Sequence, residues 1–145
     1  MNQSQNHQQS YYSTEVMGYL QALPNSGALN IDHKSVFMAE VGSLDIGVKI
    51  KLYIKINSDI IQEVKYLVYG DSFTIATLGY LSEQLPGLKL SRATNFSFNQ
   101  AIEQLSIPQT KLNELKIIKT AINNIAEQYI QSKNSIINSI IHGSK

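Results

Sequence analysis

Apolar and polar residues alternate strictly in one stretch of the chain. In VKIKLYIKI (48–56) every second residue is apolar, and three of the four residues between them are lysines. A period of two predicts a β-strand with one buried and one solvated face. The turn residues Asn57-Ser58-Asp59 follow, and a second alternating run covers 60–69. The two runs predict an antiparallel hairpin, and residues 36–41 a third strand.

Elsewhere apolar residues recur at three- and four-residue spacing, which predicts amphipathic helices. These helices cover residues 12–23, the segment from the corner at 71 to Leu85, residues 98–105 and a long C-terminal segment. In the C-terminal segment the stripe runs from Leu112 to Tyr129. It then extends past residues 132–134 through further isoleucines, Ile136, Ile137, Ile140 and Ile141. We expect these isoleucines to pack in the core, and an exposed remainder near residue 137 could form a partner face.

The order of the elements, helix, sheet and then helices, predicts the fold class. It is an α+β domain, with a small antiparallel sheet of about three strands and helices packed on one face. The 145 residues suit one domain with a single core. Residues 1–10, MNQSQNHQQS, are polar and predict a disordered tail. Residues 11–145 are then the single domain, ending in a long helix.

Composition excludes several classes of function. The net charge is +1, from 12 basic and 11 acidic residues, and no basic run suggests nucleic-acid binding. The chain has no cysteine, so no disulfide, thiolate metal site or cysteine nucleophile is available. The N-terminus lacks a signal-peptide pattern, and no apolar run approaches the ~18 residues of a membrane span. We therefore expect a soluble, cytoplasmic protein. No base–nucleophile constellation indicates an enzyme.

The stretch VYGDSFTIATLGYLSEQL (68–85) contains the corner between the last strand and the next helix. Free backbone N–H groups and the helix dipole converge at such a corner. Asp71 or Ser72 there is expected to accept bonds from N–H groups one turn on. Glu114 lies early in the C-terminal helix, where acidic residues are also favoured. Capping alone explains these acidic residues.

The same elements, with their connecting residues, resemble a known family, the iron–sulfur cluster scaffolds of IscU and the NifU N-terminal domain. The matching pieces, in order, are Tyr12-Ser13, PNSG (24–27), Val41-Gly42, Gly47, KLYIKIN (51–57), YGDSFTIATL (69–78), Pro108, Lys111 and the helix from Ala121 to Tyr129. In the family the strand KLQIKV is followed by YGCGSAIASS. The resemblance covers residues 12 to 130 and implies the family's fold.

The family's cluster ligands are all replaced in this chain. The family uses three cysteines, an aspartate two residues after the first, and a histidine beside the third. By resemblance the first cysteine falls at Ile46, the aspartate at Val48, the second cysteine at Asp71, and the His-Cys pair at Asn113-Glu114. Clusters need soft thiolate ligands in most cases. We therefore expect no cofactor, and predict that the purified protein carries no iron–sulfur cluster.

A divalent metal ion is the alternative to capping. Asp71 and Glu114 would be hard oxygen ligands, with Asn113 and Asp45 nearby. Such a set suits magnesium, calcium, manganese or ferrous iron. We favour capping because two carboxylates make a weak site. In addition, Ile46 and Val48 put apolar side chains where the family has ligands.

The resemblance also implies partners. The family's chaperone-recognition stretch, Leu-Pro-Pro-Val-Lys, reads IPQTK (107–111) here, so Pro108 and Lys111 are candidate partner-binding residues. The leading hypothesis is a non-catalytic, scaffold-like protein of iron–sulfur assembly that binds a cysteine desulfurase or a chaperone. The alternatives are an oxygen-ligated metal protein, and an interaction module that reuses the fold. In the latter the isoleucine-rich helix could form a homodimer.

Overall fold

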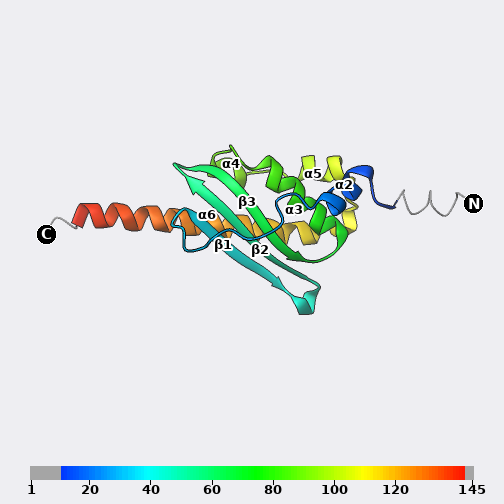
Figure 1. Cartoon of the computed structure of the whole chain (residues 1–145), viewed down its shortest axis with the longest axis horizontal. Coiled ribbons are helices and arrows are strands. Elements are labelled where there is room, and N and C mark those ends of the chain that lie inside the picture. Colours follow the sequence, from blue (N-terminus) through cyan, green and yellow to red (C-terminus); the bar gives the residue numbers. More distant parts are fainter. Residues whose placement is uncertain (1–10, 143–145) are drawn as a thin grey trace, which may run out of the picture.

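The computed structural model describes residues 11–142, so the predicted polar tail, residues 1–10, lies outside the described residues. A three-stranded antiparallel sheet has the order β1-β2-β3 (Figure 1). Its strands are β1 (Val36–Ser43), β2 (Val48–Asn57) and β3 (Ile60–Tyr69). The sequence-based prediction of three strands, with both hairpin strands in place, is confirmed.

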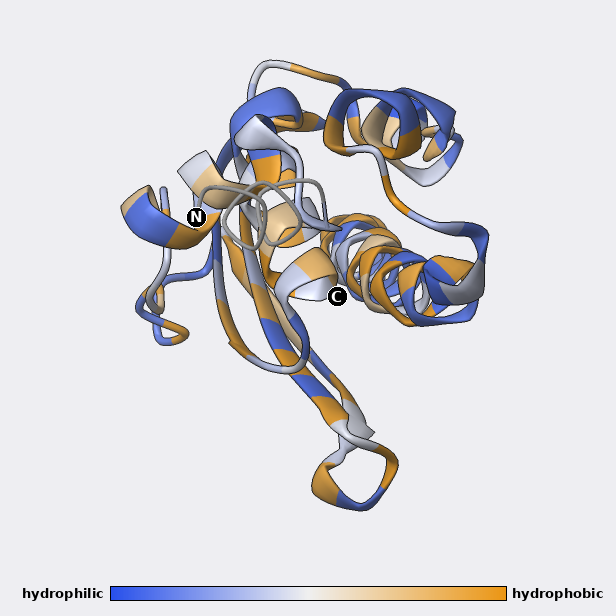
Figure 2. Ribbon diagram, turned by 90° about the vertical axis from the view of Figure 1, so that its right-hand side faces the viewer, coloured by the Kyte–Doolittle hydropathy of each residue, from blue (hydrophilic) through white to orange (hydrophobic). Residues whose placement is uncertain are grey.

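The turn between β2 and β3 has the geometry that suits a tight hairpin. Asn57 pairs with Ile60, and the two residues between them are both left-handed, with φ 50° at Ser58 and 67° at Asp59. Turns with positive φ at both central positions match the right-handed twist of the strands. The β1–β2 connection is a short 3-10 helix, η1 (Leu44–Ile46), which projects away from the rest of the domain (Figure 2).

Apolar and polar residues alternate along β2, as the hydropathy colouring of the strands shows (Figure 2). The alternation separates a buried face from one on which the lysines are half-buried. The predicted inward residues are all buried: Val48, Ile50, Leu52, Ile54 and Ile56. The helix α6 (Leu112–His142) lies against β1 and β2, and α3 (Ser72–Gln84) lies against β3. The α+β class, with helices on one face of a small sheet, is confirmed.

Helix α3 is buried on nearly all sides, whereas its sequence predicts one apolar stripe. The apolar stripe consists of Ile75, Leu78, Leu81 and Leu85. Ile75 is only half-buried, whereas Thr77 and Ser82, which lie outside the stripe, are buried. Their hydroxyls donate to carbonyls of the same helix, at 2.7 Å to Phe73 and 2.6 Å to Gly79. These bonds remove most of the cost of burying the hydroxyls. The helix is therefore enclosed by other helices as well as by the sheet.

Three shorter α-helices and a second 3-10 helix, η2 (Gln109–Lys111), complete the described chain. The three α-helices are α2 (Thr14–Ala22), α4 (Leu90–Thr94) and α5 (Asn99–Leu105). Helix α2 packs on α3, where a side chain at Gly79 would come within 2.9 Å of the Tyr19 ring. Leu23, the last residue of the predicted first helix, is instead its left-handed cap and is 43 % exposed. The sequence did not predict α4, a five-residue helix without a side-chain cap.

The long helix α6 corrects one expectation. Ile118, Ile122 and Ile125 are buried as predicted, but the later isoleucines are not in the core. The exposed fractions are 59 % for Ile136, 47 % for Ile137, 72 % for Ile140 and 61 % for Ile141. The helix continues beyond the end of the sheet (Figure 1), and no other described residue covers this part of its apolar stripe. Within residues 11–142, no helix is long and apolar enough to cross a membrane.

Candidate functional site

Asp71 lies at the corner between β3 and α3 and caps the helix. Its backbone is extended, with φ −82° and ψ 175°, and its Oδ1 accepts a hydrogen bond from the Thr74 N–H at 2.9 Å. The bond satisfies one of the free N–H groups of the first turn, and the carboxylate complements the helix dipole. The predicted capping role of Asp71 is confirmed.

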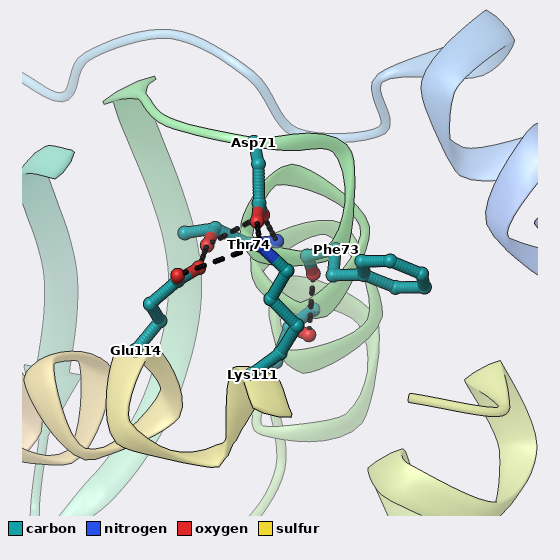
Figure 3. A network of polar contacts seen from close by, with 6 residues as sticks. Asp71, Phe73, Thr74, Lys111 and Glu114 are labelled. Carbon is teal, nitrogen blue, oxygen red and sulfur yellow. Dashed lines mark hydrogen bonds and ion pairs between the residues drawn. The ribbon is translucent and has the colours of Figure 1, made fainter. Parts of the chain in front are cut away.

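Lys111 places its ammonium group between Asp71 and Glu114. Its Nζ lies 2.8 Å from Asp71 Oδ2 and 3.7 Å from Glu114 Oε1 (Figure 3). Lys111 ends the 3-10 helix η2 (Gln109–Lys111), directly before α6, and Glu114 follows in the first turn of α6. The side chains of all three residues are about one-third exposed, so the pairs are partly shielded from water.

Thr74 links the two carboxylates from the α3 side. Its Oγ1 lies 3.1 Å from Asp71 Oδ1 and 3.3 Å from Glu114 Oε2 (Figure 3). The hydroxyl has one proton and can donate to one carboxylate at a time. Thr74 and Lys111 together hold Asp71 and Glu114 side by side. The resemblance, which places both acids at cysteine positions of the family, implied their proximity, but the parts played by the lysine and the threonine were not predicted.

The ammonium of Lys111 offsets part of the charge of the two carboxylates. Burial raises the pKa of Asp71, but hydrogen bonds from Lys111 and from the Thr74 backbone oppose it, and the net pKa lies below its usual value. The hydrogen bond to Asp71 raises the pKa of Lys111, and the nearby carboxylates add to that shift. Asp71 and Lys111 are therefore both charged at neutral pH. Without a cation between them, the carboxylates of Asp71 and Glu114 would repel each other. Lys111 supplies that cation.

The other predicted positions do not join this cluster. Ile46 is 63 % exposed in η1, and Asn113 is exposed on α6. Val48 is buried at the start of β2. It lies close to the corner, since a Cβ atom added at Gly70 would be 3.5 Å from the Val48 Cγ2. Asp45 is exposed in η1. Among residues 11–142, no group of three or more His, Cys, Asp or Glu side chains could hold a metal ion.

Of the two candidate partner-binding residues, Lys111 belongs to this group of side chains and Pro108 lies beside it in the chain. Pro108 is half-buried and precedes η2, and Lys111 ends η2. The Lys111 ammonium is engaged with Asp71 and Glu114 within its own chain. The sequence does contain a signal for the pairing of Lys111 with Glu114, because the two residues are three positions apart at a helix start. A role for Pro108 and Lys111 in binding a partner stays a prediction.

Comparison with known proteins identifies the family of this chain. The model of the NifU-like N terminal domain family matches residues 11–135. The iron-sulfur cluster assembly protein IscU of Plasmodium falciparum is 26 % identical over 118 residues, which cover 81 % of this chain and 73 % of that protein. The iron-sulfur cluster assembly scaffold protein IscU of Azotobacter vinelandii is 28 % identical over 123 residues, 84 % of this chain and 96 % of that protein.

A solved structure agrees with these relatives. A putative iron-sulfur cluster assembly scaffold protein for the SUF system, from Fervidobacterium islandicum AW-1, is 26 % identical with a TM-score of 0.50. The aligned part covers 57 % of this chain and 58 % of that one. These relatives are named as assembly proteins or scaffolds, whereas the present chain has no cysteine. With the family model matching most of its length, this chain belongs to the NifU-like N-terminal domain family, as a degenerate member that lacks the cluster cysteines.

Proposed function

We propose that this protein takes part in iron–sulfur cluster assembly as a scaffold-like binding protein that carries no cluster and catalyses no reaction. The observation that carries the proposal is the Lys111 ammonium between Asp71 and Glu114. By resemblance, those two acids stand where the family has two of its cysteines. These positions therefore hold an ion-paired, hydrogen-bonded set of side chains in place of thiolates.

The charge of Lys111 also weakens the metal-ion alternative. A divalent cation between Asp71 and Glu114 would have to displace the ammonium, which already lies 2.8 Å from Asp71 Oδ2. Two carboxylates alone make a weak site for a hard cation. Repulsion between the ammonium and the cation would weaken it further. We therefore propose that Asp71, Lys111 and Glu114 have a structural role. Partners would then recognise the surface of the fold.

The partners that fit this proposal are a cysteine desulfurase or a chaperone of the same assembly system. The support is the family membership and the segment around Pro108, which directly precedes Lys111 and the other residues of the ion-paired group. Binding can be measured with the purified desulfurase and chaperone of the same organism, by calorimetry. Pro108→Ala is expected to weaken binding to the chaperone, whereas Lys116→Ala, an exposed lysine of α6, should not. Failure of wild type to bind either protein would contradict the proposal.

Cluster uptake separates this proposal from an active scaffold. Wild type and a triple variant, Ile46→Cys with Asp71→Cys and Glu114→Cys, are incubated anaerobically with iron, sulfide and a thiol, and then desalted. We expect visible-range absorbance to persist only in the triple variant, because it alone supplies thiolates. A cluster retained by wild type would mean that outside ligands complete the site.

Thermal melts with manganese or ferrous iron test the metal-ion alternative. We expect no rise in the melting temperature of wild type, because Lys111 occupies the space between the acids. If a metal site exists, the melting temperature rises with added metal, by the linkage between binding and stability. Asp71→Asn and Glu114→Gln would each abolish that rise.

A further inference from the structure

The C-terminal part of α6, residues 130–142, extends past the sheet and is called the overhang below. At about 1.5 Å per residue it is about 20 Å long. Tyr129 marks its base, because the Tyr129 hydroxyl donates to Asp59 Oδ1 at 2.6 Å, at the turn that ends the sheet. The overhang carries five exposed isoleucines, Ile130, Ile136, Ile137, Ile140 and Ile141.

These isoleucines continue the side of α6 that faces the core. At 3.6 residues per turn, Ile136 and Ile140 lie on the same face as Ile122 and Tyr129. The other positions of the overhang are mostly uncharged and polar: Gln131, Ser132, Asn134, Ser135, Asn138 and Ser139. The overhang is thus an amphipathic helix whose apolar side lacks a cover among the described residues.

The charge of the overhang favours a second copy as the cover. Lys133 is the one Lys, Arg, Asp or Glu between residues 128 and 142, and its Nζ pairs with Asp59 of its own chain at 2.9 Å. In a two-fold dimer the same patch of each copy forms the interface. Lys133 lies on the same side of the helix as Ile140, and its pairing with Asp59 keeps its charge from being buried there without a partner. A membrane-binding helix usually has Lys or Arg along its polar face. This overhang has Ser, Asn and Gln there.

A pocket at the base of the overhang adds surface for such a partner. Its volume is about 600 Å³, and its walls come from the hairpin turn, from α4 and from α6, including Leu90, Thr94, Ala126 and Ile130. A stable interface buries about 800 Å² on each partner. One helix face about 20 Å long and about 10 Å wide supplies only a few hundred Å². The pocket must contribute if the dimer is to be stable.

We propose that two copies pair their overhangs antiparallel, about a two-fold axis near Ile136 and Ile137, so that Ile141 of each copy reaches the pocket beside Ile130 of the other. Antiparallel pairing joins the tip of each overhang to the base of its partner, which parallel pairing cannot do. The residues between base and tip bury their isoleucines against each other. This dimer is independent of the proposed role in cluster assembly.

The absence of cysteine makes the register directly testable. Single-cysteine variants are oxidised mildly and examined on non-reducing gels. Ile137→Cys should cross-link to itself, because it lies near the axis, and Asn138→Cys on the polar face should not. Ile130→Cys mixed with a size-tagged Ile141→Cys should give a mixed dimer, whereas neither should cross-link alone. Self-cross-linking of both would mean parallel helices and would overturn the proposal.

Sedimentation velocity measures the dimer itself. Wild type should shift from monomer to dimer as protein concentration rises. Ile137→Asp should weaken the dimer about 100-fold, since symmetry removes two buried isoleucines from one interface. Asn138→Asp is the matched control and should leave it unchanged, and circular dichroism should show both variants folded. A wild type that stays monomeric at every concentration would overturn the proposal, whether or not another protein or a lipid vesicle binds it. Neither experiment uses metal, cluster or assembly partner, so each tests the dimer alone.

Discussion

The two parts of α6 have the same apolar spacing and opposite surroundings. From Leu112 to Tyr129 the stripe faces the sheet and α4, and Ile118, Ile122 and Ile125 are buried. From Ile130 onward the same stripe is exposed. The spacing of apolar residues therefore determines which side of a helix is apolar, but the extent of the neighbouring sheet determines how much of that side is covered. The uncovered part of the stripe is the surface on which we propose that a second copy packs.

The largest expected effect comes from removing side chains in the covered part. Ile122→Ala should lower the free energy of unfolding by about 2–5 kcal/mol, because it leaves a cavity in the core. Ile137→Ala, measured at a concentration where the protein is monomeric, should change it by no more than about 0.5 kcal/mol. Urea denaturation of both variants checks the difference.

Equal losses in the two variants would mean that the overhang folds against the domain. Raising the protein concentration sharpens the comparison. If the overhang pairs with a second copy, Ile137→Ala becomes more costly at high concentration, because binding then adds to stability. The effect of Ile122→Ala should not depend on concentration in that way.

The sheet could be predicted from the sequence because its signals are local. The alternation from Val48 to Ile56 fixes the buried face, and Asn57-Ser58-Asp59 allows a turn with two left-handed residues. Capping by Asp71 followed from its position before a helix. Each of these features depends on residues close together in the chain.

The features that could not be predicted depend on distant residues. Helix α3 is enclosed because other helices surround it, and its buried Thr77 and Ser82 look like a solvated face in the sequence. Lys111 reaches Asp71 across forty positions of the chain, and only its pairing with Glu114 has a local signal. Helix α4 is too short to show a period. The end of the sheet, which leaves Ile136 exposed, is likewise a matter of tertiary structure.

The next effect concerns the N-terminal end of the covered part, where Glu114 meets Asp71 through Thr74 and Lys111. Asp71→Ala should lower the free energy of unfolding by about 1 kcal/mol, because the cap of α3 is lost. Asp71→Asn should cost less, since asparagine also caps. The remaining difference between wild type and Asp71→Asn measures the pairing with Lys111. Asp45→Ala in the exposed η1 is the control and should have almost no effect.

The pH dependence of that difference follows from the direction of the pKa shift. The pKa of Asp71 is lower in the folded protein than in the unfolded chain, where it is about 3.9. The stabilisation is therefore complete above the unfolded value and is lost as pH falls through the folded value. Denaturation at several pH values should show a constant gap between wild type and Asp71→Asn from pH 7 to about pH 5, and a shrinking gap below about pH 4. A gap that widens on acidification would contradict the ion pair.

The smallest effect is expected at Tyr129, where the covered part ends. Its hydroxyl accepts from the Asp59 N–H at 2.9 Å and donates to the Asp59 carboxylate, so Tyr129→Phe removes these two bonds and leaves the Lys133–Asp59 pair in place. The pair is exposed, and water replaces the lost partners, so the cost should be only about 0.5 kcal/mol. Tyr69→Phe, at a tyrosine that is 59 % exposed, is the control and should cost nothing measurable.

Two local measurements make so small an effect decisive. The hydrogen bond from Tyr129, together with that from Lys133, holds the pKa of Asp59 below its usual value, so Tyr129→Phe should raise it in a carboxyl titration followed by NMR. The Asp59 amide should also exchange its hydrogen faster, because its acceptor is gone. Amides of α6 should be protected up to Tyr129 and poorly protected beyond it in the monomer, since the overhang has no cover. Uniform protection along the whole of α6 in the monomer would show that the two parts do not differ, and that the overhang needs no partner to be stable.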